Sequence, residues 1–317
     1  MNPYLFVVGC PRSGTTLLQR VLNAHPQLAI TPESHWIPRL QAKPWALTSE
    51  GLIKPKLIRR LIAHPKFARL NISREELMRL AGNGQPMTYA SLVSTIFDLY
   101  GGVRGRTLVG DKTPDYVRKI ETLHALWPLA RFVHLVRDGR DVALSMMDWP
   151  KVRPKPGDFV TWHEDRVSTA ALWWELNVRL GRKAARSLGR ELYYEMRYES
   201  LVCHPREESA ALCAFLGVPY DDAMLHFWEG EAGSDPGLEK KRAHQPVTPG
   251  LRDWSSQLSP EDKERFEAAA GALLDELGYP RVVRNPGVEA LERAARYRRL
   301  LAQDPRTHDA QSELEVD

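Results

Sequence analysis

The sequence LFVVGCPRSGTT at residues 5–16 decides the fold, because a short apolar run leads into a loop bounded by two glycines. The spacing Gly9-xxxx-Gly14, followed by two threonines, is that of the phosphate-binding loop of nucleotide enzymes. Backbone N–H groups of such a loop, together with the first turn of the next helix, can hold an anion without a metal. Thr15 stands where that loop has a lysine, and the cation of the loop is Arg12. The loop therefore predicts an anion site, and it argues against a kinase that holds a magnesium triphosphate.

The composition is that of an ordinary globular protein, with 43% apolar and 26% charged residues in a chain of 317. This length suffices for a large core in one domain or two. The formal net charge is only +4, so we expect no nucleic acid partner.

Three signals predict a cytoplasmic protein without a membrane span. Cys10, Cys203 and Cys213 form an odd set without metal-ligand spacing, which is typical of a reducing compartment. The sequence opens almost directly on its first apolar run, which leaves no room for a signal peptide. No apolar run approaches the roughly 20 residues that a membrane helix needs.

Short apolar runs predict four strands, at Tyr4–Gly9, Thr107–Gly110, Arg131–Val136 and Leu192–Arg197. Helical stretches alternate with them, at Thr15–Ala24, Asp115–Trp127, Asp141–Met147, His163–Ser187, Pro205–Phe215, Pro260–Leu277 and Pro286–Leu301. This alternation predicts an α/β fold, a parallel β-sheet flanked by helices on both faces, with a P-loop-like nucleotide site. Because ligands of such folds bind at the carboxyl ends of the strands, we expect Arg12, Lys112 and Arg137 to gather there.

The chain is expected to form a single domain over residues 1–305, with a disordered polar tail at 306–317. Residues 41–106 are helical but weakly patterned, and they are predicted to be an insertion over the sheet. The segments 148–162 and 229–256 are rich in Gly, Pro and charge, and they are long enough to be active-site covers.

Four segments, in the right order, resemble the sulfotransferases that use 3′-phosphoadenosine 5′-phosphosulfate (PAPS). Pro11 to Thr16 resembles the 5′-phosphosulfate loop of that family, and Arg137 to Ser145 resembles its 3′-phosphate motif. Arg197 to Val202 is similar to the later strand-to-helix segment, and Gln245 to Trp254 to the C-terminal loop. The second motif also makes physical sense, since an arginine fork and a hydroxyl one to two helical turns further on can hold the same phosphate.

The resemblance implies that PAPS is the sulfuryl donor, that adenosine 3′,5′-bisphosphate is the product, and that no metal takes part. It also implies a set of nucleotide-binding residues: Pro11, Arg12, Ser13, Gly14, Thr15, Thr16, Arg137, Ser145, Tyr198, Thr248 and Arg252.

Within the family, the likeness is closest to the tyrosylprotein sulfotransferases, through the segment Glu33-Ser-His-Trp-Ile-Pro-Arg39. It implies that Glu33 is the general base, and that Arg12 and Lys112 stabilise the charge that develops during transfer. Arg252 departs from that group, which has a serine there. The acceptor hydroxyl therefore stays open between peptide tyrosine, a glycan, a lipid and a small molecule.

Alternatives stand beside these roles. His35 is a second candidate base, Lys112 could belong to a surface ion network, and Arg137 could only pair with Asp138 or Asp141. The whole protein could be a P-loop small-molecule kinase, or a non-catalytic protein that binds an anionic partner.

Several other residues favour structural roles. His134 and the pair Trp173-Trp174 are predicted to be core side chains, and Cys10 a small loop residue without nucleophilic function. Leu291, Tyr297 and Leu301 on the last predicted helix suggest a surface for a second subunit in a homodimer.

Overall fold

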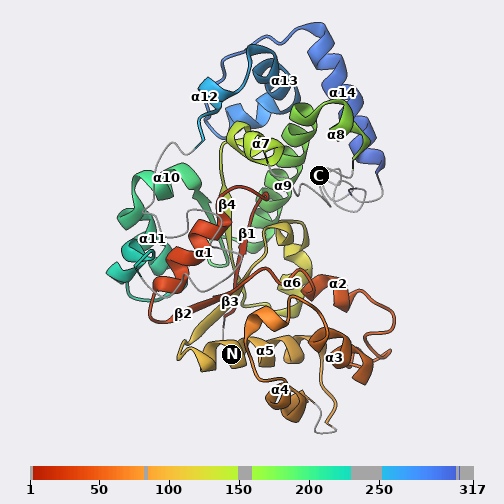
Figure 1. Cartoon of the computed structure of the whole chain (residues 1–317), viewed down its shortest axis with the longest axis vertical. Coiled ribbons are helices and arrows are strands. Elements are labelled where there is room, and N and C mark those ends of the chain that lie inside the picture. The colour runs from red at the N-terminus through yellow and green to blue at the C-terminus, as the bar shows by residue number, and fades with distance from the viewer. Residues whose placement is uncertain (1–2, 82–84, 149–158, 230–251, 305–306, 308–317) are drawn as a thin grey trace.

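Five parallel strands form one sheet at the centre of the molecule (Figure 1). The computed structural model describes residues 3–81, 85–148, 159–229, 252–304 and 307. The strands are β1 (Leu5–Val8), β2 (Leu28–Thr31), β3 (Leu108–Lys112), β4 (Arg131–Val136) and β5 (Tyr193–Arg197). Their order is β2-β3-β1-β4-β5, and each neighbouring pair runs parallel. The predicted fold class is thus confirmed, and the carboxyl ends of β1, β3 and β4 share one edge.

Helices cover both faces of the sheet, because alternate residues of each strand point to opposite sides. Leu5 and Val7 of β1 are buried against one group of helices, and Phe6 and Val8 against the other. The first group is α1 (Thr15–Ala24), α10 (Tyr198–Cys203), α11 (Pro205–Leu216) and the 3-10 helix η3 (Asp222–His226). The second is α5 (Tyr89–Val103), η2 (Pro114–Lys119) and α6 (Ile120–Leu126), with the end of α9.

A separate group of helices lies at the top of Figure 1. It consists of α7 (Gly139–Met147), α8 (Val160–Glu164), α9 (Arg166–Leu188), α12 (Trp254–Gln257), α13 (Pro260–Glu276) and α14 (Val288–Gln303). Trp173 and Trp174 are fully buried there, as predicted for core residues. Tyr297 and Leu301 are buried in the same core, so the predicted dimer surface is wrong for these two residues, and only Leu291 is exposed.

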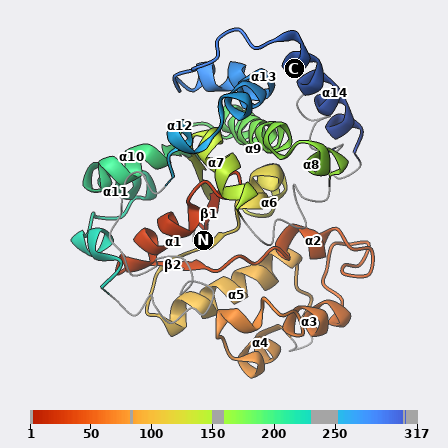
Figure 2. The same ribbon diagram turned by 45° about the horizontal axis from the view of Figure 1, so that its top comes forward.

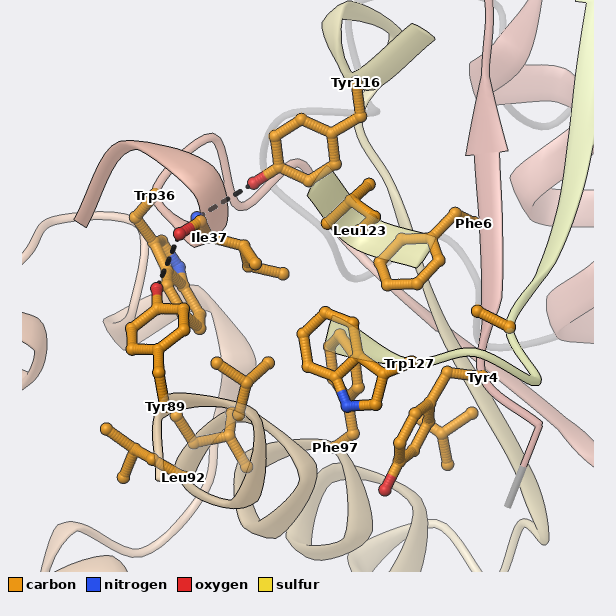
Figure 3. Close-up of a cluster of buried hydrophobic side chains, with 14 of the residues drawn as sticks. Tyr4, Phe6, Trp36, Ile37, Tyr89, Leu92, Phe97, Tyr116, Leu123 and Trp127 are labelled. Carbon is orange, nitrogen blue, oxygen red and sulfur yellow. Dashed lines mark hydrogen bonds between the residues drawn. The ribbon is translucent and has the colours of Figure 1, made fainter. Parts of the chain in front are cut away.

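The insertion between β2 and β3 forms the lower part of Figure 1 and lies apart from the α13–α14 helices in Figure 2. It contains α2 (Ile37–Gln41), α3 (Pro55–Ile62), η1 (Ala68–Leu70), α4 (Arg74–Ala81) and α5. An aromatic cluster joins it to the sheet (Figure 3), with ring centroids 5.1 Å apart for Tyr4 and Phe97 and 5.6 Å for Phe6 and Trp127. The insertion therefore rests on the same sheet whose edge carries the site.

Three expectations need correction. The strand β2 was not predicted, since its four residues follow a proline turn and are defined by pairing with β3, in the register Leu28↔Leu108. The helix expected over 115–127 is a 3-10 turn followed by α6. Inside the segment 148–162, expected to be a loop, α8 begins at Val160.

Other features complete the comparison with the sequence. No helix within the described ranges is long and apolar enough to span a membrane. Most of the predicted tail at 306–317 lies outside the described residues, although Thr307 is buried and its hydroxyl donates to the carbonyl of Leu301.

Candidate active site

The loop between β1 and α1 has the backbone of an anion site. Arg12 has φ 80° and Gly14 has φ 95°, both in the left-handed region that non-glycine residues rarely adopt. The amide of Ser13 donates to the carbonyl of Cys10 (3.1 Å), which closes the turn. Helix α1 begins after Gly14 without a side-chain cap and without an acid in its first turn. Its first-turn N–H groups are therefore suited to an external anion.

Gly14 also brings two predicted site residues together. A Cβ on Gly14 would lie 2.4 Å from Cδ2 of Tyr198, so the aromatic ring can approach only a glycine. On that ring stacks the guanidinium of Arg137, whose Cζ is 4.3 Å from the ring centroid. The carbonyl of Arg137 accepts a hydrogen bond from Nε1 of the buried Trp174 (3.1 Å). A rigid stack thus links the loop after β1 to the loop after β4.

Two buried polar atoms at this edge of the sheet lack a hydrogen-bond partner within the described residues. Within the described residues, neither Oγ of Ser13 nor Nε of Arg137 has a hydrogen-bond partner. The Nη2 atom of Arg137 binds the carboxylate of Asp141 at 3.2 Å, so the expected alternative pairing does occur. Because buried donors without partners are costly, these atoms fit a phosphate-bearing ligand. The pairing with Asp141 and a phosphate contact are compatible, since the guanidinium has five donors.

Arg12 connects the two halves of the site. Its Nε donates to Oγ of Ser145 at 3.0 Å, which leaves the proton of that hydroxyl available for a ligand. That Ser145 and Arg137 hold the same phosphate stays a prediction. Burial lowers the pKa of Arg12, and the nearby charges of Arg252 and Arg137 lower it further, against the opposing effect of Glu33. The three arginines therefore create a concentrated positive potential at this edge of the sheet.

Glu33 and Lys112 form the centre of the site on the other side of the loop. Oε1 of Glu33 lies 2.7 Å from Nζ of Lys112, which also donates to Oγ1 of Thr16 at 3.3 Å. Burial acts to raise the pKa of Glu33, but the hydrogen bond from His35 and the charge of Lys112 outweigh it. The pKa is held well below its usual range, so the carboxylate is ionised.

The segment that carries Glu33 is held by long-range hydrogen bonds that the sequence did not reveal. Thr31 donates to the buried Asp111 (2.8 Å), and the amide of Ser34 donates to Oγ1 of Thr113 (3.0 Å). The hydroxyl of Tyr116 bonds Oγ of Ser34 (2.7 Å) and accepts from the amide of Ile37 (3.0 Å).

Tyr89 completes this support by donating to the carbonyl of Ile37 at 2.6 Å (Figure 3). The bonded residues of this set lie 52 to 82 positions apart along the chain, so no local motif predicts these bonds. A tyrosine in a largely apolar helix, such as Tyr89 in α5, is a sequence signal that could have marked one of these bonds.

Arg140 belongs to the same motif as Arg137 but has a structural role. It is fully buried, with Nη2 2.8 Å from Asp138 and Nη1 2.9 Å from Glu267 of α13. Trp254 covers its guanidinium, with 3.5 Å from Cζ to the ring centroid. Arg140 thereby fastens α12 and α13 to the start of α7.

The remaining predictions have varied outcomes. Thr248 lies outside the described residues, while Arg252 forms an ion pair with Asp148 at the end of α7.

His134 is a buried core residue, as predicted, with Nδ1 2.5 Å from the hydroxyl of Tyr193, and burial lowers its pKa to about 3. Burial also raises the pKa of the Cys10 thiol, which agrees with a non-nucleophilic residue. No cluster of three or more His, Cys, Asp or Glu side chains suited to a metal occurs among the residues described.

A sequence model described as "Sulfotransferase family" matches residues 3–222, more than half of the chain. The protein belongs to the sulfotransferase family, as the resemblance of its motifs indicated. It is an enzyme that transfers a sulfuryl group from PAPS to a hydroxyl acceptor. The kinase and the non-catalytic binder are thereby set aside.

Several relatives are protein-tyrosine sulfotransferases. Protein-tyrosine sulfotransferase A of Caenorhabditis elegans is 26% identical over 285 residues, which cover 88% of this chain and 67% of the worm protein. For the protein-tyrosine sulfotransferase of Drosophila melanogaster, the values are 28% identity, 87% of this chain and 52% of the fly protein. Nodulation protein NoeE of Sinorhizobium fredii is 31% identical over 323 residues, 93% of this chain and 71% of that protein.

Solved structures agree with the fold. The sulfotransferase domain of the Synechococcus PCC 7002 olefin synthase superposes with a TM-score of 0.56 at 24% identity, over 93% of this chain and 94% of that one. The sulfotransferase domain from the curacin biosynthetic pathway superposes with a TM-score of 0.52 at 19% identity, over 94% of this chain and 98% of that one.

The predicted cytoplasmic location is wrong by comparison with these relatives. The protein-tyrosine sulfotransferases act in the Golgi lumen. The prediction rested on unpaired cysteines and on an early first strand, and neither feature determines the compartment of a catalytic domain.

Proposed function

We propose that the two phosphorylated ends of PAPS bind on either side of Tyr198. The 5′-phosphosulfate lies on the loop from Pro11 to Thr16, against the first-turn amides of α1 and the guanidinium of Arg12. The 3′-phosphate takes the unpartnered Nε of Arg137 as a donor, together with the hydroxyl of Ser145. Two contacts support this proposal: Nε of Arg12 lies 3.0 Å from Oγ of Ser145, and Cζ of Arg137 lies 4.3 Å from the ring centroid of Tyr198.

We propose that Glu33 is the general base and that Lys112 stabilises the developing charge. One observation carries this assignment: the 2.7 Å contact of the two groups, beside Thr16 of the phosphate loop. Sulfuryl transfer resembles phosphoryl transfer, so positioning and charge stabilisation supply most of the catalysis. The acceptor hydroxyl gives its proton to Glu33 as its oxygen bonds to sulfur, and the sulfur–oxygen bond to the phosphate breaks.

The low pKa of Glu33 adds a condition to this mechanism. A carboxylate paired with an ammonium is a weak base, because the cation favours the ionised form. When PAPS is bound, Lys112 can direct its charge to the bridging oxygen of the leaving phosphate. The basicity of Glu33 then rises when the donor is in place, which couples proton abstraction to donor binding.

For the acceptor, we propose a tyrosine hydroxyl flanked by acidic residues in a peptide. Several relatives are named protein-tyrosine sulfotransferases. The charge around Glu33 also supports an anionic acceptor, because Nζ of Lys66 lies 3.9 Å from Oε2 of Glu33. Arg39 and Lys66 lie close enough to His64 that their charges, together with burial as the largest cause, lower its pKa. Cations therefore cluster on the side of Glu33 where we place the acceptor.

The proposed function is tested by turnover with radiolabelled PAPS. The acceptors are a tyrosine peptide with acidic flanks, the same peptide with neutral flanks, a glycan and a lipid alcohol. We expect the acidic peptide to give the highest kcat/KM, and phenylalanine in place of tyrosine to abolish labelling. Faster labelling of the glycan or the lipid alcohol would overturn the acceptor assignment while leaving the donor site intact.

A further inference from the structure

His35 occupies a position that the proposed chemistry does not yet use. Its Nε2 lies 3.1 Å from Oε2 of Glu33, the carboxylate oxygen that Lys112 does not contact. On the opposite side of the ring, Nδ1 lies 3.8 Å from Oδ2 of Asp115 in η2. Arg118 holds Asp115 with a 2.8 Å hydrogen bond, and its guanidinium lies over the buried Trp173, 4.6 Å from the ring centroid. A chain of contacts therefore runs from the core to Glu33.

The backbone of His35 is unusual. It has φ 55°, in the left-handed region that non-glycine residues rarely adopt. Hydrogen bonds on both sides hold it there, from Ser34 to Thr113 and from Ile37 to Tyr116. This turn directs the imidazole back toward Glu33, two residues earlier in the chain. Strain that the surroundings enforce so firmly is typical of a functional site.

We propose that His35 is a positioning residue for the general base, whose Nε2–H orients the carboxylate of Glu33 toward the acceptor hydroxyl. This inference rests on the proposed role of Glu33. Lys112 holds one carboxylate oxygen and His35 the other, so the rotation of the carboxylate about its last bond is restricted. A base fixed in this way keeps a lone pair directed at the acceptor when Lys112 turns to the donor.

Two substitutions separate this role from a structural one. In His35→Gln, the amide nitrogen stands as many bonds from Cβ as Nε2 of histidine, so it can still donate to Glu33. In His35→Asn, the amide nitrogen stands where Nδ1 was, and the donor to Glu33 is lost. Asparagine nevertheless tolerates the left-handed backbone as well as histidine does, and glutamine does so less well.

The orders of stability and activity are therefore expected to be opposite. His35→Asn should keep the thermal midpoint of the wild type and lose about 10- to 100-fold in kcat, the size expected for a hydrogen bond to a charged group. His35→Gln should have the lower thermal midpoint and keep kcat within about threefold. The KM for PAPS should change little in either variant. If His35→Gln loses as much activity as His35→Asn, the imidazole itself is needed and the inference is wrong.

A double-mutant cycle with Glu33→Gln tests whether His35 acts through Glu33. We expect His35→Asn to cause no further loss in the Glu33→Gln background, measured in single turnovers with radiolabelled PAPS. A further loss of tenfold or more in that background would show that His35 acts elsewhere and would overturn the inference. If Glu33→Gln alone retains more than a tenth of the wild-type rate, the proposed base fails first. Full activity of His35→Asn beside an inactive Glu33→Gln would contradict only the role of His35.

Discussion

The proposed donor side and the proposed acceptor side of this site are built in different ways. On the donor side, the loop after β1 and the loop after β4 each carry their functional residues within one short stretch, and Tyr198 stacks between them. On the acceptor side, Glu33 follows a short strand, and its segment is held by hydrogen bonds from residues about 80 positions away. In this proposal, donor binding depends on local stretches of the chain, whereas the positioning of the base depends on the whole sheet edge.

The largest effect is expected from removing the base. Glu33→Gln should lower kcat by about 10²- to 10⁴-fold, because general-base assistance is lost, while the affinity for adenosine 3′,5′-bisphosphate stays within twofold. Glu121→Gln, at an exposed position of α6, is the control and should behave as the wild type. Steady-state kinetics and calorimetry measure both quantities. If Glu33→Gln lost as much affinity for adenosine 3′,5′-bisphosphate as it loses in kcat, the proposed separation of a donor side from an acceptor side would be wrong.

On the donor side, Arg137→Ala should change the KM for PAPS, whereas Glu33→Gln changes kcat. It removes a charge-assisted contact with the 3′-phosphate, so the KM for PAPS should rise about 10- to 100-fold, while kcat at saturating PAPS changes little. Arg137→Lys keeps the charge without the fork, and we expect an intermediate KM. A fall in kcat at unchanged KM would contradict the assignment.

A smaller effect should follow from loosening the support of Glu33. Tyr116→Phe removes the hydroxyl that bonds Ser34 and Ile37, and we expect kcat to fall about 3- to 10-fold. Tyr4→Phe is a matched control in the same aromatic cluster, since its hydroxyl bonds Asp98 at 3.2 Å instead. Both variants should lose stability, but only the first should lose activity. Equal kcat values would show that these bonds serve the fold alone.

The smallest effect concerns the pH dependence of stability. Because the pKa of Glu33 is lower in the folded protein, its interactions stabilise the fold above the unfolded value of about 4.3 and are lost as pH falls below it. The thermal midpoints of the wild type and Glu33→Gln should therefore differ most near pH 6–7, and the difference should begin to shrink as pH falls below about 4 and go on shrinking toward the lower pKa of the folded state. A difference independent of pH would argue against an ionised Glu33 in this ion pair.

The same contrast explains what the sequence could predict. The phosphate loop and the strand–helix alternation follow from local chemistry, and the family resemblance supplied Glu33 and Lys112. The hydroxyls of Tyr116 and Tyr89 could not be predicted, because only the packed insertion brings them to Ile37. Arg140 shows the reverse case, since it lies inside a functional motif, yet it is buried against Glu267, which lies 127 positions away.

The most direct test of the central claim is a crystal structure with adenosine 3′,5′-bisphosphate. We predict the 5′-phosphate within hydrogen-bonding distance of the amides of Gly14 to Thr16, and the 3′-phosphate against Arg137 and Ser145. The adenosine should lie beside Tyr198, and Glu33 should not touch the nucleotide. A nucleotide bound away from either arginine, or one held by Glu33 and His35, would contradict this account.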